Sequence, residues 1–204
     1  FALVESGSIT KMMKGNRGIT IGDNQYPAAI FTVAWTESER NAIGVYTVEI
    51  DNTNKKDEAW YINTDITYAF GSGKVTGTYG TATARAIADT LWTSQDKTDG
   101  KIREGEDVGD VAVEGLKTIK KRMIDNQCAG LLAPSDYMAI KAAEGIAIDS
   151  GWKTWRASVR TKCNSMQTQI DNAADVDALA ALFTYTEQED KSFTRPLGEF
   201  PTKG

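Results

Sequence analysis

The stretch that most constrains the fold is residues 131–166, LLAPSDYMAIKAAEGIAIDSGWKTWRASVRTKCNSM, which predicts two amphipathic helices joined by a short turn. Pro134 and Ser135 favour a helix start, because proline is tolerated in the first turn and a serine hydroxyl accepts a hydrogen bond from a free N–H group. Gly145 favours the end of that helix. The apolar residues that follow are spaced by three or four and therefore share one face of a second helix. They are Trp152, Trp155, Val159, Cys163, Met166 and Ile170.

The first part of the chain, residues 1–80, predicts a small antiparallel β-rich domain. Its strands are short and are separated by glycine-containing turns, as in Gly71-Ser72-Gly73, which predicts a hairpin. Thr36 and Glu39 form the pattern of a capping box, so we expect one helix that begins there and ends near Gly44. The segment VYTVEI, residues 45–50, has the alternation of a strand. Together these strands predict an antiparallel meander.

Helical patterns follow the β-rich domain, so the sequence as a whole predicts an α+β fold. Residues 81–109 are expected to form a linker or exposed arm, with a helix over Thr81–Trp92. Residues 110–183 predict a helical bundle whose last helix is capped by Asp175. Residues 184–204 contain two prolines and no clear period, so we expect an extended tail that packs on a neighbouring molecule or frays.

Composition narrows the possible functions. The 204 residues carry a net charge of −5, which argues against a nucleic-acid-binding domain. The chain contains no histidine and so lacks the commonest general base and metal ligand, which makes an enzyme less expected. No apolar run is long enough for a transmembrane helix, and the first residues do not match a signal peptide. The chain starts at Phe1, which leaves open a removed N-terminal piece or a misassigned first residue.

Several local patterns suggest chemistry but fit a structural interpretation better. Phe70–Thr76 lacks the first glycine and the hydroxyl residue of a phosphate-binding loop, so a hairpin is preferred. Asp51–Glu58 is rich in oxygen ligands but lacks the glycine and the final glutamate of a calcium-binding loop. A glycosidase site needs two carboxylates, one of which has its pKa raised by an apolar pocket. The polar run that contains Glu104, Glu106 and Asp107 offers no such pocket, so a catalytic pair is not expected there. We therefore predict no catalytic, cofactor-binding or metal-binding residue, and no cofactor.

The charged, aromatic and sulfur-containing residues of the helical region are also expected to be structural. A sugar-stacking platform could be formed by the aromatic residues Tyr137, Trp152 and Trp155, but their helical spacing favours a core position. Arg156 and Arg160 are expected to pair with Asp136 or Glu144 across the two helices. The basic clusters at residues 117–122 and 153–162 read as solvated helix faces. Cys128 and Cys163 are predicted to be small core residues rather than a disulfide framework.

The two-helix stretch resembles a helical module found in a family of tailed-bacteriophage proteins from tail and tail-fibre regions. The family pattern is LL-x-P-[ST]-D-[WY]-M-x-x-[KR]-x-x-E-x-G, followed after about ten residues by W-x-x-[WY]-R-x-x-[VL]-R. It is carried here, with the glutamate directly before the glycine, by Leu131, Leu132, Pro134, Ser135, Asp136, Tyr137, Met138, Lys141, Glu144, Gly145, Trp152, Trp155, Arg156, Val159 and Arg160. A weaker similarity, to a YP…WT-x-x-E run near the start of such proteins, lies in Tyr26, Pro27, Trp35, Thr36, Glu39, Arg40, Ile43 and Gly44. Most members have no assigned activity, so the resemblance implies a phage context rather than a molecular role.

The resemblance and the residues together lead to one expected function and two alternatives. We expect a non-enzymatic structural protein of a tailed-phage virion, in the tail, baseplate, neck or fibre attachment. Its partners would be other virion structural proteins and copies of itself. A trimer is favoured if the protein belongs to a fibre. We expect no contact with a membrane and no direct contact with nucleic acid. It would be assembled in the host cytoplasm. The alternatives are a tail-fibre assembly chaperone that is absent from the particle, and a glycan-binding or glycan-cleaving tail protein.

Overall fold

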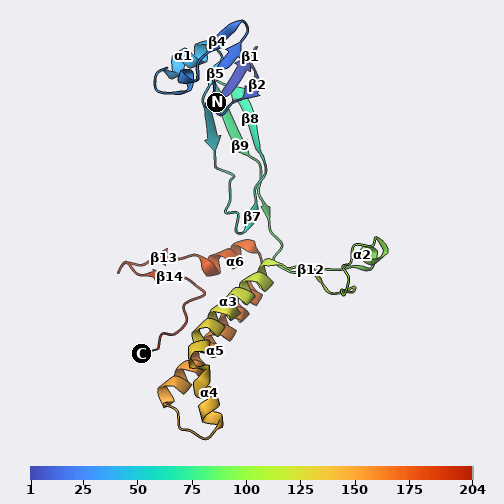
Figure 1. The fold of residues 1–204 in the computed structure, drawn as a ribbon, viewed down its shortest axis with the longest axis vertical. Coiled ribbons are helices and arrows are strands. Elements are labelled where there is room, and N and C mark those ends of the chain that lie inside the picture. The colour runs from blue at the N-terminus through green and yellow to red at the C-terminus, as the bar shows by residue number, and fades with distance from the viewer. Residues whose placement is uncertain (204) are drawn as a thin grey trace. The chain divides into compact units, whose positions relative to one another are not determined.

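The computed structural model describes residues 1–203 and divides the chain into two compact units, Phe1–Thr83 and Ala84–Gly204, of which Gly204 lies outside the described residues. Small sheets make up most of the first unit, and packed helices dominate the second (Figure 1). The expected α+β class is thereby confirmed. Within the described residues, no helix is both long and apolar enough to cross a membrane.

The first sheet of the N-terminal unit has the antiparallel order β2-β1-β5. Its strands are β1 (Ala2–Glu5), β2 (Ser8–Met12) and β5 (Val45–Tyr46), and beside it lie the hairpin β3 (Ile19–Ile21) and β4 (Asn24–Tyr26), the 3-10 helix η1 (Ala28–Phe31) and the helix α1 (Glu37–Ala42). The expected capping box is confirmed, because Thr36 accepts from the Glu39 N–H at 3.3 Å and Glu39 Oε2 accepts from the Thr36 N–H at 2.7 Å. Leu3, Ile30 and Val45 form the buried centre of this region.

The second sheet of this unit has the order β6-β9-β8 and differs from the expected meander. Its strands are β6 (Val48–Asp51), β8 (Ile66–Gly71) and β9 (Lys74–Tyr79). The hairpin between β8 and β9 is confirmed, and the positive φ angles of Ser72 (52°) and Gly73 (75°) suit its tight turn. However, β6 runs parallel to β9, which a long connection permits, and the expected 45–50 strand is divided at Thr47 between the two sheets.

The expected helix over Thr81–Trp92 is wrong. The segment instead contributes two short strands, β10 (Thr83–Ala84), which pairs with β7 (Tyr61–Ile62), and β11 (Thr90–Leu91), which pairs with β12 (Val111–Val113). Between them, the carbonyl oxygens of Ala86 and Ile87 accept from the N–H groups of Leu116 and Lys117, at 2.9 and 3.0 Å. These backbone groups satisfy the start of the next helix, so they are unavailable for a helix of their own.

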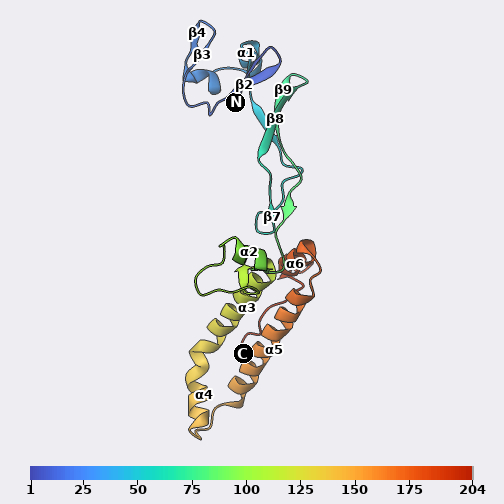
Figure 2. The same ribbon diagram turned by 90° about the vertical axis from the view of Figure 1, so that its right-hand side faces the viewer.

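The helices of the second unit follow the expected order. They are α3 (Leu116–Leu132), the 3-10 turn η2 (Ala133–Ser135), α4 (Asp136–Ala143), α5 (Ser150–Asn172) and α6 (Val176–Phe183). Figures 1 and 2 show α5 returning alongside α3 after the turn that follows α4. The turn at Gly145 (φ 81°) and the cap at Asp175, which accepts from the Ala178 N–H at 2.8 Å, are both as predicted.

The core of the second unit lies between the facing apolar stripes of these helices. Its buried members include Leu116, Ile124 and Cys128 on α3, Val159, Cys163, Met166 and Ile170 on α5, and Val176 and Leu179 on α6. Trp152 and Trp155 continue the α5 stripe but are only half-buried. Ser135 stands at the N-cap position of α4, as expected, but its hydroxyl does not cap a free N–H group of that helix. Its hydroxyl donates to the Leu132 carbonyl at 2.9 Å, and η2 joins α3 to α4 without a break.

The expected tail, residues 184–204, is more ordered than its sequence suggested. It contains the hairpin of β13 (Thr186–Glu187) and β14 (Phe193–Thr194). Leu197 is fully buried, and its carbonyl oxygen accepts from Lys162 Nζ at 2.8 Å. Trp155 Nε1 donates to the Pro201 carbonyl at 2.9 Å. The described end of the tail therefore packs on α5 of its own chain, which corrects the expectation of a wholly irregular segment.

Candidate functional site

The most distinctive surface of the helical unit is α4 and the turn that follows it, at the lower end of Figure 1. None of the eight residues of α4 is buried, although six of them are apolar. Tyr137 is 52% exposed, Ile140 62% and Ile146 50%. We call these three residues the apolar hairpin end. Large apolar side chains that leave this much surface in water are typical of an interaction site when they lie together.

A pocket of about 220 Å³ lies between α4 and the start of α5. Its walls include Tyr137, Met138, Ile146 and Trp152, with Lys141 and Asp149 at its polar side. Asp149 is also the N-cap of α5, since its Oδ1 accepts from the Trp152 N–H at 3.2 Å. The hairpin end therefore combines projecting apolar side chains with a small apolar recess, a shape suited to a complementary protein surface.

Arg156 fixes the position of the hairpin end. The residue is buried, and Nη1 donates to the Leu132 carbonyl at 2.8 Å and to the Ser135 hydroxyl. Nη2 donates to the Asp136 carboxylate at 2.6 Å. The predicted pairing of Arg156 with Asp136 is confirmed, and the guanidinium group also holds the last turn of α3. Arg160, the other arginine of that prediction, is exposed.

Two of the three aromatic residues considered as a sugar platform are in contact with the tail. Trp152 and Trp155 meet edge to face, with ring centroids 5.6 Å apart and an interplanar angle of 86°. Lys203 Nζ lies 4.2 Å from the Trp152 ring centroid, and the Trp155 indole is tied to Pro201. Tyr137 lines the same pocket as Trp152, between α4 and the start of α5. The two tryptophans thus hold the tail to α5, whereas about half of Tyr137 is exposed to solvent.

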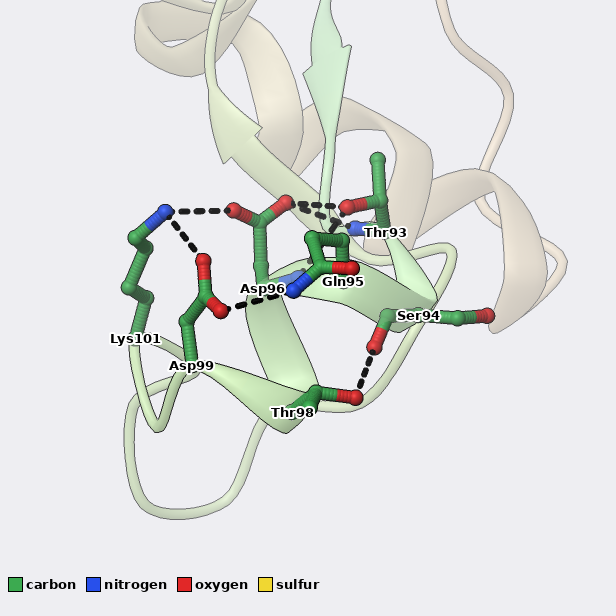
Figure 3. A network of polar contacts seen from close by, with 7 residues as sticks. All are labelled: Thr93, Ser94, Gln95, Asp96, Thr98, Asp99 and Lys101. Carbon is green, nitrogen blue, oxygen red and sulfur yellow. Dashed lines mark hydrogen bonds and ion pairs between the residues drawn. The ribbon is translucent and has the colours of Figure 1, made fainter.

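The acidic run that follows β11 is structured rather than loose. It contains the short helix α2 (Ser94–Thr98), and Figure 3 shows its polar network. Asp96 accepts from the N–H and hydroxyl groups of Thr93, at 3.0 and 2.5 Å, while Lys101 Nζ bonds to Asp99 at 2.7 Å. These hydrogen bonds, from Thr93 and then Lys101, lower the pKa of Asp96, and the hydrogen bond from Lys101 lowers that of Asp99. Carboxylates stabilised in this way suit capping rather than general-acid chemistry.

Local contacts also engage three of the carboxylates weighed from the sequence, Glu106, Asp107 and Asp51. Glu106 accepts from Trp92 Nε1 at 2.6 Å, and Asp107 pairs with Lys97 at 3.4 Å. In the turn after β6, Asp51 accepts from the N–H and hydroxyl groups of Thr53, at 2.8 and 2.6 Å. Across residues 1–203, no group of three His, Cys, Asp or Glu side chains is placed to hold a metal ion.

The cysteines and the basic clusters are also part of the scaffold. Cys128 and Cys163 are free and buried, and burial, followed by the contact with Cys128, raises the pKa of Cys163 to about 12. A thiol of that kind is a poor nucleophile at neutral pH. In the basic clusters, Lys121 pairs with Asp171 at 2.8 Å and Arg122 pairs with Glu114. These contacts join α5 and the segment before α3 to α3 itself.

The apolar hairpin end was missed by the sequence interpretation, which treated residues 131–166 as scaffolding throughout. One signal was present: Tyr137, Met138 and Ile140 of α4 cannot all lie on one narrow helical stripe, and two further isoleucines, Ile146 and Ile148, follow in the turn. A helix with apolar residues on several sides needs more than one covering partner, and α5 supplies only one. Compared with family models, curated proteins and solved structures, the chain shows no match.

Proposed function

We propose that this protein is a non-enzymatic structural component of a tailed-phage virion, in the tail, baseplate, neck or fibre attachment, and that it acts through protein–protein contacts. The observation that carries the proposal is the apolar hairpin end, where α4 buries none of its described residues against its own chain. The phage context rests on the resemblance of residues 131–160 to the helical module of tail-region proteins.

The divided core of the first unit supports an assembly role. Buried residues of the first unit fall into small clusters, such as Ala2, Val4 and Val75, rather than one extended core. A domain with little buried apolar area is only marginally stable alone and gains stability from burying a face on a partner. In the proposed assembly, Tyr137 and the two isoleucines of the hairpin end form the apolar centre of the interface, and the charged residues around them form its rim.

The virion role is tested by quantitative mass spectrometry of purified particles. A structural component is present at a fixed copy number relative to the other particle proteins and remains after stringent purification. A tail-fibre assembly chaperone, the main alternative, is abundant in infected cells and lost from the particle. Its detection only in the cells would replace the structural role by the chaperone role.

The glycan alternative is tested separately by incubating the purified chain with bacterial polysaccharides and peptidoglycan. The proposal expects neither saturable binding nor release of reducing ends. Turnover that is abolished by changing a single aspartate or glutamate would refute the non-enzymatic role. Tyr68, which is exposed on β8, is the first aromatic residue to replace if binding without turnover is found.

A further inference from the structure

The sequence KMMKGNRG, from Lys11 to Gly18, comprises the last two residues of β2 and the loop that leads to β3; Figure 2 labels both strands. It borders an open pocket of about 420 Å³. We call this the basic pocket and define it by the side chains of Lys11, Lys14 and Arg17, with Asn16 and Phe31 also in its wall. No acidic residue lines it. The pocket belongs wholly to the first unit and is independent of the apolar hairpin end.

The three cations of the basic pocket are not used by the fold. Among residues 1–203, neither Lys11, Lys14 nor Arg17 has an ion pair or a side-chain hydrogen bond. This contrasts with Lys121 and Arg122 of the second unit, whose charges are neutralised by Asp171 and Glu114. Three unneutralised positive charges within seven residues are notable in a chain of net charge −5. They create a local positive potential that attracts anions.

The backbone of the loop supports the same conclusion. Within the part of the chain that the structure describes, the N–H groups of residues 14–17 have no hydrogen-bond partner. Gly15 has a φ angle of 75°, and successive N–H groups around a left-handed residue form a concave site that binds anions. The amides and the cationic side chains thus provide hydrogen bonds and charge within one short loop.

The loop is held in place by close packing. A Cβ on Gly15 would lie 2.9 Å from the Phe1 ring and 3.2 Å from Phe31 Cβ, and one on Gly18 would lie 2.6 Å from the Tyr26 carbonyl oxygen. The Met13 N–H also donates to the Phe1 carbonyl at 2.8 Å. Because its neighbours determine the course of the loop, little backbone entropy is lost when a ligand binds, and the entropic cost falls on the lysine and arginine side chains.

We propose that the basic pocket binds a tetrahedral oxyanion, the phosphate or sulfate group of a small ester. Lys14 and Arg17 supply charge-assisted hydrogen bonds to its oxygens, and the loop amides supply further donors. The volume of the pocket exceeds that of a bare ion, so the ester carries an organic body that packs on Phe31. The proposal does not depend on the virion role and stands if that role fails.

The test is calorimetric titration of the full chain with glycerol 3-phosphate and, separately, with a sugar sulfate. Saturable binding of either ester supports the proposal, and the tighter of the two identifies the oxyanion. Replacing both Lys14 and Arg17 by glutamine should weaken binding by about 100-fold, since each charge-assisted contact contributes about a factor of ten. The matched control is the double variant K55Q/K74Q, which removes the same charge from the same unit outside the pocket. It should change affinity less than about twofold.

A second measurement locates the ligand. In amide NMR spectra, the signals of residues 14–17 should shift on adding the ester that binds, while those of the β8–β9 turn should not. Absence of saturable binding at about 10 mM of either ester would overturn the proposal. So would an equal loss in K55Q/K74Q. Binding of an oligonucleotide or of anionic vesicles without binding of either small ester would overturn it too, because it would show a diffuse electrostatic surface rather than a pocket.

Discussion

Arg156 Nη2 donates to the Asp136 carboxylate at 2.6 Å and thereby joins the second turn of α5 to the first turn of α4. The pair is asymmetric, because the arginine side chain is 7% exposed and the aspartate side chain 60% exposed. The guanidinium group has exchanged water for three protein acceptors, which are Asp136, the Leu132 carbonyl and the Ser135 hydroxyl. It is thus a buried connector that determines where the apolar hairpin end points.

Replacing Arg156 by lysine should therefore destabilise the helical unit although the charge is kept. An ammonium group cannot reproduce the planar fork that reaches all three acceptors, so we expect a loss of about 1–2 kcal/mol in the free energy of unfolding. Urea unfolding followed by circular dichroism measures it. The exposed Arg160→Lys substitution, one turn along α5, is the control and should have no measurable effect. Equal stabilities of the two variants would show that the fork is unimportant.

Gly115 should tolerate no side chain. A Cβ there would lie 2.3 Å from the carbonyl carbon and oxygen of Ala88, and both atoms belong to the backbone. Gly115→Ala should cost more than about 2 kcal/mol of stability, because relief of the overlap requires a shift of the segment that caps α3. Gly130→Ala lies in the same helix with no atom within 4 Å of its Cβ, so it should stabilise by about 0.5–1 kcal/mol. Thermal melting of both variants checks the contrast.

Asp89 should make the stability of the second unit depend on pH. Its carboxylate accepts from the Gly115 N–H at 2.7 Å and from the Thr118 hydroxyl at 2.9 Å, and these bonds lower its pKa. A lowered pKa means that the ionised form favours the folded state. The contribution is present above the ordinary aspartate pKa of about 3.9 and is lost as the pH falls through the lowered value.

The Asp89→Asn variant should therefore unfold at lower urea concentration than the parent at pH 7, and the difference should shrink as the solution is made acidic. The measurement is the unfolding midpoint of both proteins at a series of pH values. A midpoint difference that stays constant down to pH values below the ordinary aspartate pKa would contradict the assignment of Asp89 as the cap of α3.

Leu197 should matter for stability despite its place in the tail. It is fully buried, and its N–H donates to the Leu182 carbonyl at 3.1 Å. Leu197→Ala should cost about 2–4 kcal/mol, whereas Leu131→Ala, at an exposed position of α3, should cost much less. If both variants melt like the parent, the tail does not pack on α5 and the earlier expectation of a free segment regains support.

Local patterns were predictable from the sequence because neighbouring residues determine them. The Thr36–Glu39 capping box, the Gly71–Gly73 turn and the Asp175 cap all appear where expected. The segment 81–92 has a helical period, but the carbonyl groups of Ala86 and Ile87 accept hydrogen bonds from the first N–H groups of α3 instead. The close approach of this segment to the start of α3 requires a glycine at position 115. No local pattern in residues 81–92 reveals that their carbonyl groups bond to the start of a helix more than twenty residues further along the chain.

The candidate site was only partly predictable for a similar reason. The Arg156–Asp136 pair follows from the antiparallel arrangement of two helices, so their sequence suggests it. The exposure of Ile140 and Ile146 depends instead on which helix faces remain uncovered, which periodicity alone does not reveal. The basic pocket was overlooked because Lys11, Lys14 and Arg17 are separated by residues of other types, and the interpretation turned to the denser clusters in the helices.

The central claim, that the protein assembles through the apolar hairpin end, is tested most directly by its mass in solution. The parent chain of 22.2 kDa should give a light-scattering mass that is a multiple of this value, a threefold one if the protein belongs to a fibre. The double variant I140E/I146E places charges in the proposed interface and should reduce the mass to 22.2 kDa with little loss of helical structure, because both side chains are exposed in the single chain. A parent protein that remains a 22.2 kDa monomer at every concentration would contradict the account.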